Sequence, residues 1–205
     1  FNHAKGDWVF RMDVDYFFHE KDIPNIKRLL KKYSTSPAIA FPQYQFFTPD
    51  RYQLKTKICL ALNKKKFPEI KLNGGGDLVL PTLDNKLIEV SDVPNSRIPI
   101  YQYDSTFRTK KIIAEDRARF ARAWYRQFGN YGNRGGETPE LAFEAWFSMI
   151  KERYTKHTFK FKMKNHPKYI CDDLNNLKQE EFGYSAFGLS EITKRPIINL
   201  SLIHI

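Results

Sequence analysis

The sequence predicts an α/β domain that ends in a helical extension. Short apolar runs typical of strands come first, at residues 7–13, 38–47, 58–62 and 98–103. Longer segments with apolar residues at helical spacing come last, at residues 110–127, 138–154 and 172–181. Strands followed by helices in this order suit a sheet flanked by helices, with the last helices as an appendage.

Local signals mark the first strand and the first helix. Apolar side chains around Val9 indicate a buried strand over residues 7–13. The pair Ile23-Pro24 is expected to open a helix, with Asp22 as its N-cap and proline in its first turn.

Further strand segments follow that helix. Residues 38–41 and 44–47 predict a pair of strands or one bulged strand. Pro42 lies between them and favours a sheet edge, because proline cannot donate to the hydrogen-bond ladder. We interpret residues 58–62 as a strand, although so short an apolar run does not separate a strand from a helix by periodicity. Residues 98–103 predict the last strand.

The C-terminal part is expected to be helical. Residues 110–127 carry an apolar stripe and a basic stripe, and glycines within residues 129–136 end that helix. Thr138 is the expected N-cap of the next helix, which runs to about Tyr154. A third helix is expected over residues 172–181.

The composition favours a folded domain with a basic surface. Hydrophobic residues make up 41% of the chain and aromatic residues 15%, which is enough for a sizeable core. The formal net charge of +11 predicts attraction to polyanions such as nucleic acid, membrane surfaces or diphosphate-bearing substrates. Cys59 and Cys171 are the only cysteines and match neither a disulfide framework nor a zinc site. We therefore expect a reduced, cytoplasmic setting and, because no apolar run is long enough, no membrane span.

The pair Asp13 and Asp15 is the strongest chemical signal in the chain. The two carboxylates follow an apolar run and stand one residue apart, so an extended strand would project them from the same face. Like charges this close repel each other unless a cation lies between them. Magnesium typically takes one or two protein carboxylates and completes its shell with water and phosphate oxygens. The alternative is a surface turn after the strand, where aspartate is common.

The surroundings of this pair resemble the metal-binding segment of family 2-type nucleotide-sugar glycosyltransferases. The segment from Gly6 to Asp15 begins Gly-Asp-Trp-Val and ends Asp-x-Asp. A second segment, from Ile98 to Asp104, is similar to the late strand of these enzymes, and a charged helix follows it. The chain has Val14 where many members have alanine, Tyr16 where many have glutamate, and Gln102 where many have histidine.

The resemblance implies an A-type glycosyltransferase fold, a Rossmann-like mixed sheet flanked by helices, of which this chain holds a part. The implied reaction transfers a sugar, as in hexosyltransferases, from a nucleoside-diphosphate sugar to a glycan, lipid or protein acceptor. Asp15 is then the expected ligand of Mn²⁺ or Mg²⁺, and Asp13 assists it or contacts the ribose. Such a cation neutralises charge on the leaving diphosphate.

Other residues are candidates for the base and for donor contacts. Asp77 is the candidate general base, because it follows three glycines on a loop that can approach a ligand closely, but it also suits the cap of a Gly-rich turn. Asp104 is the rival base, or the N-cap of the turn into the next helix. Gln102, Arg119 and Arg122 are candidate donor contacts. Guanidinium groups suit phosphate, although arginines along one helix face also form an ordinary solvated surface.

Both ends of the chain suggest a piece of a longer reading frame. Family members carry most of a nucleotide-binding half-domain ahead of the aspartates, so we expect an N-terminal truncation and no turnover by this chain alone. Residues 200–205 resemble a translated sequencing adapter, with a docked terminal strand as the alternative. We therefore expect a fragment from metagenomic or phage-like DNA. It holds the metal-binding and acceptor side of the transferase domain over residues 1–128, a helical extension over residues 129–199, and an adapter-derived tail over residues 200–205.

The competing class is a basic nucleic-acid-binding module without catalysis. Its support is the net charge of +11, the arginines within residues 110–127 and the many aromatic side chains that could stack on bases. The aromatic residues fall mostly in strand-like runs, where core packing explains them, and no nucleic-acid-binding motif is present. We therefore expect a sugar-nucleotide donor rather than nucleic acid as the partner.

Overall fold

The structure is a computed structural model that describes residues 1, 3–73, 80–177 and 189. Its contacts divide the chain into two compact units. The first, here called the sheet unit, comprises residues 1–45, 54–103 and 164–171. The second, the helical unit, comprises residues 46–53, 104–163 and 172–205. The helix expected at residues 110–127 therefore belongs to the helical unit.

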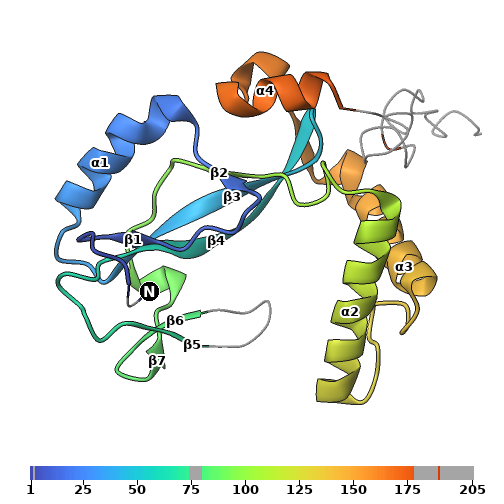
Figure 1. The fold of residues 1–205 in the computed structure, drawn as a ribbon, viewed down its shortest axis with the longest axis horizontal. Coiled ribbons are helices and arrows are strands. Elements are labelled where there is room, and N and C mark those ends of the chain that lie inside the picture. The colour runs from blue at the N-terminus through green and yellow to red at the C-terminus, as the bar shows by residue number, and fades with distance from the viewer. Residues whose placement is uncertain (2, 74–79, 178–188, 190–205) are drawn as a thin grey trace, which may run out of the picture. The chain divides into compact units, whose positions relative to one another are not determined.

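A mixed sheet is the main feature of the sheet unit (Figure 1). Its strands are β1 (Val9–Phe10), β2 (Tyr16–Phe17), β8 (Ile100–Gln102) and most of β3 (Ala38–Thr48) and β4 (Arg51–Leu62). The ends of β3 and β4 that meet at residues 46–53 belong to the helical unit, where β9 (Thr158–Lys160) pairs antiparallel with β4. The strand order is β1-β4-β3-β8-β2, with β3 and β8 parallel, and with β1–β4 and β2–β8 antiparallel. The predicted α/β class is confirmed at this level, and the strands expected at residues 58–62 and 98–103 are present.

The centre of the sheet is strand β3, and this corrects the expected position of Pro42. Residues 38–47 form one continuous strand, which lies between β4 and β8 rather than at the edge. Both faces of β3 are buried at its start, where Ile39 and Phe41 pack in one core cluster and are fully buried. Gln43 donates a side-chain hydrogen bond to the carbonyl of Thr56 at 2.6 Å. The side chain of Gln43 thus supplies a hydrogen-bond donor next to Pro42, which has no backbone N–H.

The first strand is shorter than expected. Only Val9 and Phe10 are in β1, paired with Leu62 and Ala61 of β4, and both are half-buried rather than buried. The backbone N–H of Arg11 still donates to the carbonyl of Leu60 at 3.0 Å. Beyond this residue the chain leaves the sheet, because it enters a turn.

A small second sheet follows β4 in the sheet unit. It consists of β5 (Lys71–Asn73), β6 (Leu80–Leu83) and β7 (Lys86–Leu87), all paired antiparallel. Asp84 and Asn85 connect the last two strands with φ of 51° and 61°. Positive φ at both central positions is typical of a tight hairpin turn, and aspartate and asparagine tolerate it. The expected turn at Asp77 lies outside the described residues.

Helix α1 (Ile23–Lys32) packs on the main sheet through one apolar face. Ile26 is buried, and Leu29, Leu30 and Tyr33 pack against the cluster around Phe41. Proline lies in the first turn as predicted, but the side chain of Asp22 makes no capping hydrogen bond. Instead a short 3₁₀ turn (Glu20–Asp22) precedes the helix, and His19 caps that turn by accepting from the backbone N–H of Lys21.

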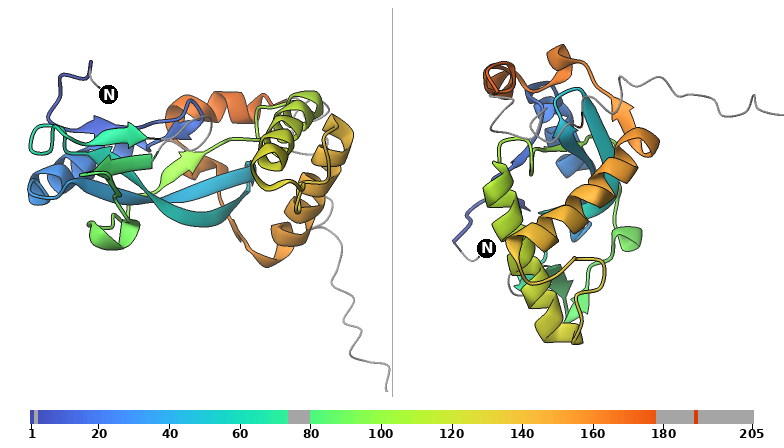
Figure 2. Two further views of the ribbon diagram at one scale, coloured as in Figure 1. Left: turned by 90° about the horizontal axis from the view of Figure 1, so that it is seen from below. Right: turned by 90° about the vertical axis from the view of Figure 1, so that its right-hand side faces the viewer.

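The helical unit is built around α2 (Lys110–Phe128) and α3 (Pro139–Lys156), which Figure 2 shows side by side. Small residues line their contact, with Ala118, Ala121 and Ala142 in one buried cluster. Thr109 and Thr138 cap the two helices by accepting from backbone N–H groups three residues later. Both predicted helices are confirmed, and the break after the first is a left-handed glycine, Gly129, with φ of 69°.

The last described helix begins earlier than expected. Helix α4 spans Lys168–Asn175, whereas the sequence predicted a helix over residues 172–181. Pro167 precedes it directly and accepts a hydrogen bond from the backbone N–H of Ile170, so the helix begins as soon as the proline allows. Most residues after 177, including the tail at 200–205, lie outside the described part. Within the described part, no helix is both long and apolar enough to cross a bilayer.

Candidate functional site

The segment from Asp13 to Tyr16 is a turn. The backbone N–H of Tyr16 donates to the carbonyl of Asp13 at 3.0 Å, and Val14 at the tip is 97% exposed. The side chain of Asp13 is 48% exposed and lies 3.6 Å from a guanidinium nitrogen of Arg11, while Asp15 is half-buried. The two carboxylates therefore come from a surface turn rather than from one face of a strand.

This turn lies directly beside the strand that carries Gln102. Tyr16 pairs with Gln102 in the β2–β8 ladder, and the backbone N–H of Tyr103 donates to the carbonyl of Asp15 at 3.1 Å. The two segments that resemble glycosyltransferases are far apart in the sequence, yet they are neighbours in the sheet unit. The structure thus brings Asp13, Asp15 and Gln102 into one region.

A lysine that the sequence analysis did not single out completes this region. Nζ of Lys55, in strand β4, donates to Oε1 of Gln102 at 3.4 Å, and Gln102 is 7% exposed. Tyr16 donates from its hydroxyl to Oε1 of Gln43, in the strand next to β8. The sequence held one signal for Lys55, since polar and basic residues in the first half of β4 interrupt an otherwise apolar strand.

The carboxylates of Asp13 and Asp15 give the turn a local negative charge. Burial raises the pKa of the Tyr16 hydroxyl, and the charges of Asp13 and Asp15 raise it further, against the opposing charge of Arg11. The phenol therefore stays protonated and can donate a hydrogen bond at neutral pH. A field of this sign attracts a cation to the turn.

The donor set fits a cation that needs few protein ligands. Within the described ranges, no group of three or more His, Cys, Asp or Glu side chains is arranged to hold a metal. Mg²⁺ and similar ions bind one or two carboxylates when substrate phosphates and water fill the other positions. Two carboxylates in an accessible turn meet that requirement, so Asp13 and Asp15 fit such an ion and would hold it jointly with a substrate.

Two other predicted site residues, Asp104 and Arg119, are held in ion pairs of the helical unit. Oδ1 of Asp104 lies 3.3 Å from Arg108, and its Oδ2 lies 3.0 Å from Arg117. Asp104 does not cap the next helix, because Thr109 does. Arg119 pairs with Asp116 at 2.8 Å.

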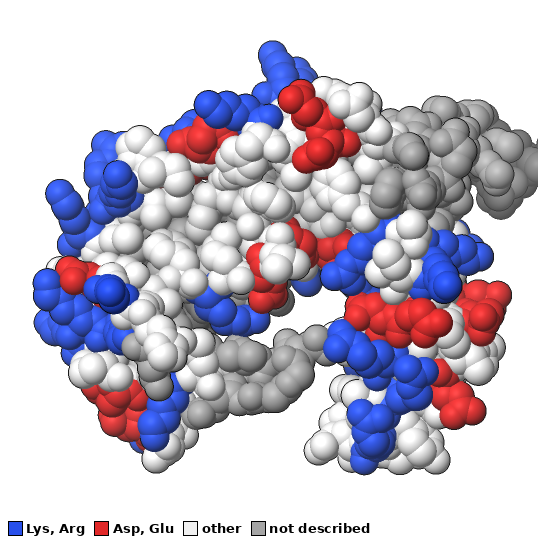
Figure 3. Space-filling view, viewed as in Figure 1, with Lys and Arg blue, Asp and Glu red and all other residues white. Residues whose placement is uncertain are grey.

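The exposed side of α2 carries both charge signs. Arg122 donates to the backbone carbonyl of Glu137 at 2.8 Å, so both of the arginines proposed as donor contacts have partners within the helical unit. Figure 3 shows blue and red side chains alternating on this part of the surface rather than a continuous basic stripe. Asp77, the candidate base, lies outside the described residues.

A buried histidine beside the site was assigned no chemistry from the sequence. His166 is 2% exposed, and its Nδ1 lies 2.7 Å from the hydroxyl of Tyr103. Burial raises the pKa of Tyr103, with smaller contributions from Tyr101, Cys171 and Tyr169. The pair joins the loop before α4 to the end of β8, and it fixes the residue that follows Gln102.

Comparisons with protein-family models, with curated proteins and with solved structures found no match to this chain.

Proposed function

We propose that the chain is a metal-dependent glycosyltransferase that uses a nucleoside-diphosphate sugar as donor. The observation that carries this proposal is the pairing of the turn at Asp13–Asp15 with the strand at Gln102. These are the two segments whose sequences resemble the same family. A turn with two carboxylates, beside a lysine and a buried amide, suits a diphosphate that arrives with its cation.

The proposal assigns a role to each candidate residue. Asp15 is the principal metal ligand, and Asp13 assists it or contacts the ribose. Lys55 supplies a positive charge on the Gln102 side of the turn, where a diphosphate oxygen would gain from it. A bound Mn²⁺ or Mg²⁺ supplies charge neutralisation for the leaving group. We retain Asp77 as the candidate for deprotonating the acceptor hydroxyl, and the acceptor is a glycan, lipid or protein.

The proposal includes a cytoplasmic location for the protein. Cys59 and Cys171 are both free thiols in the structure, which is typical of a reducing compartment such as the cytoplasm. The nucleic-acid-binding alternative has less support, because the arginines of α2 alternate with carboxylates and many aromatic residues, such as Phe41 and Phe46, are buried. Steep salt dependence of polynucleotide binding would favour that alternative.

Metal binding tests the proposal without requiring turnover. Binding of Mn²⁺ to the full chain, measured by electron paramagnetic resonance with and without a nucleoside diphosphate, should be strengthened by the diphosphate. Asp15→Asn should weaken it by about tenfold or more, because a ligand charge is lost while the shape is kept.

A matched control comes from the same unit. Asp92 is an exposed aspartate whose carboxylate accepts from the hydroxyl of Ser91 at 3.1 Å, away from the Asp13–Asp15 turn in the sequence. Asp92→Asn should leave Mn²⁺ binding unchanged. If Asp15→Asn keeps the metal affinity of the unmodified chain, the proposed site is wrong.

A further inference from the structure

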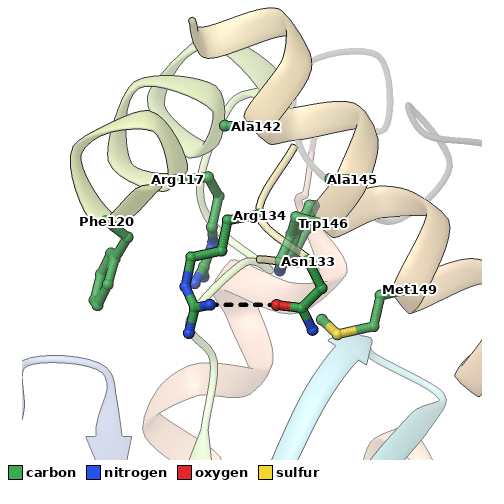
Figure 4. Close-up of a pocket in the computed structure, with 8 residues that line it drawn as sticks. All are labelled: Arg117, Phe120, Asn133, Arg134, Ala142, Ala145, Trp146 and Met149. Atoms are coloured by element: carbon green, nitrogen blue, oxygen red, sulfur yellow. Dashed lines mark hydrogen bonds between the residues drawn. The ribbon is translucent and has the colours of Figure 1, made fainter. Parts of the chain in front are cut away.

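A cavity of about 320 Å³ lies in the helical unit, between α2, α3 and the loop that joins them (Figure 4). Its apolar lining residues are Phe120, Ala142, Ala145, Trp146 and Met149. Its polar lining residues are Arg117, Asn133 and Arg134, whose side chains lie between Phe120 and Met149 in Figure 4. Volume and lining are typical of a site for a small organic molecule.

Positive charge exceeds negative charge along the lining of this cavity, because its described lining residues include two arginines, Arg117 and Arg134, and no carboxylate. Arg117 pairs with Oδ2 of Asp104 at 3.0 Å. Arg134 adds a further cation, which hydrogen-bonds Asn133 at 3.3 Å and makes no ion pair with any described carboxylate. An anion in the cavity would bring the charges closer to balance.

The unsatisfied polar atoms of α2 are donors. Nε of Arg117 and Nε1 of Trp124 are both buried, and neither has a hydrogen-bond partner within the described part of the chain. Buried polar groups are nearly always paired, so an orphan needs an explanation. Of these two residues only Arg117 lines the cavity, and because its unpaired atom is an N–H donor, the partner that it lacks is an acceptor.

Aromatic rings hold the two cavity arginines in place. The guanidinium carbon of Arg134 lies 3.5 Å from the ring centroid of Trp124, and that of Arg117 lies 5.4 Å from the ring centroid of Trp146. A guanidinium that stacks on a ring keeps the N–H groups at its edge for a bidentate contact. Such a contact is the geometry in which arginine binds carboxylate or phosphate.

We propose that this cavity binds a small organic anion, with a carboxylate or phosphate group at Arg117 and Arg134 and an apolar body against Trp146. Ligands of either kind carry an oxyanion on an apolar group about the size of one aromatic ring. The site lies wholly within the helical unit, so the proposal stands apart from metal binding at Asp15.

Four probes separate the parts of this proposal. Benzoate and phenyl phosphate carry both features, benzyl alcohol lacks the charge, and inorganic phosphate lacks the apolar body. Titration of the full chain, followed by tryptophan fluorescence and calorimetry, should show binding of benzoate or phenyl phosphate. Benzyl alcohol and inorganic phosphate should bind about tenfold more weakly or worse. The stronger of the two aromatic anions identifies carboxylate or phosphate as the group.

Arginine variants test the placement. Arg134→Gln should weaken the better aromatic anion by about tenfold, because it removes a charge without breaking an ion pair to a described carboxylate. Arg117→Gln should do the same, and if loss of its bond to Asp104 unfolds the chain, Arg134→Gln alone decides. Arg126→Gln is the matched control, since Arg126 is exposed on α2 and does not line the cavity.

Several results would overturn the inference. These are unchanged affinity in Arg134→Gln, equal binding of benzyl alcohol and benzoate, equal binding of inorganic phosphate and phenyl phosphate, and no binding of any probe up to about 10 mM. Equal loss of affinity in Arg126→Gln would also overturn it, because the effect would then reflect overall charge.

Discussion

The aspartates of the two units have opposite surroundings. In the sheet unit, Asp13 is 48% exposed and meets the guanidinium of Arg11 at 3.6 Å. In the helical unit, Asp104 is 17% exposed and is held by two guanidinium groups, one on each oxygen. The same side chain is therefore accessible to a cation in one unit and occupied by structural partners in the other. A carboxylate that the fold has already neutralised contributes to stability, while one left in a turn is available to a ligand.

Gly135→Ala should have the largest effect, because it distorts the loop that carries Arg134. Gly135 has φ of +80°, and a Cβ added there would lie 2.2 Å from the carbonyl oxygen of Leu141. Strain and overlap should lower the free energy of unfolding by about 3 kcal/mol, as measured by urea denaturation. Mn²⁺ binding at Asp15 should be unaffected where the chain remains folded.

A second glycine in the same loop provides the control. Gly129 also has positive φ, +69°, but a Cβ added there would have nothing within 4 Å of it. Gly129→Ala should therefore cost only about 1 kcal/mol, from backbone strain alone. Equal losses in the two variants would show that the contact with Leu141 does not matter.

Asp104→Asn should come next, with a loss of about 2 kcal/mol in the free energy of unfolding. The change leaves Arg108 and Arg117 without a charged partner on Asp104 while they remain half-buried. Thermal and urea unfolding measure the effect. A stability equal to that of the unmodified chain would remove the contrast between Asp104 and Asp13 and would return Asp104 to the candidates for catalysis.

The core of the sheet unit should weaken at alkaline pH through Cys59. Burial raises the pKa of its thiol from 9.0 to about 11, helped by the charges of Glu89 and Asp92. The unfolded chain thus releases this proton at a lower pH than the folded chain. The stabilising contribution is complete below about pH 9 and is lost as pH rises through about 11, by an amount on the order of 2–3 kcal/mol.

The measurement is the pH dependence of urea unfolding in the unmodified chain and in Cys59→Ala. Subtraction of the two curves removes the contributions of tyrosines with raised pKa values, such as Tyr16 and Tyr103. The alkaline slope should be shallower in the variant. Parallel curves between about pH 9 and 11 would show that the thiol does not titrate differently in the folded state.

Asp13→Asn should have the smallest effect on stability. Its ion pair with Arg11 is long and largely exposed, so the free energy of unfolding should change by less than about 1 kcal/mol. Mn²⁺ binding should nevertheless weaken, although less than in Asp15→Asn. A large loss of stability would place Asp13 with Asp104 among the structural carboxylates.

Helix signals in this chain are local, and the sequence located them well. Thr109 and Thr138 are capping residues a few positions from the N–H groups they satisfy, and Gly129 ends its helix through its own φ. The start of α4 lies at Lys168, directly after Pro167 and four residues before the predicted start. The edge position expected for Pro42 was wrong, because strand neighbours depend on residues far away in the chain.

The sequence also indicated the aspartate pair and the late strand as chemically informative, and the structure places them side by side. It did not indicate that Lys55 hydrogen-bonds Gln102, because the two residues come from different strands, β4 and β8, that only folding brings together. Neither did it indicate that Arg119 and Arg122 have partners within their own unit, since a basic stripe looks the same with or without acceptors nearby.

The sequence by itself determined the α/β class and the two long helices, because caps and periodicity act over a few positions. For Asp13 and Asp15 it left both a strand and a surface turn open, and the structure shows the turn. Only the tertiary structure decided which charges are neutralised. It pairs Asp104 with two arginines, leaves Asp13 exposed, and stacks Arg134, which lines a cavity of mixed polarity, on a tryptophan. Electrostatic interactions depend on distance and burial in space, and neither quantity is fixed until the strands and helices have packed.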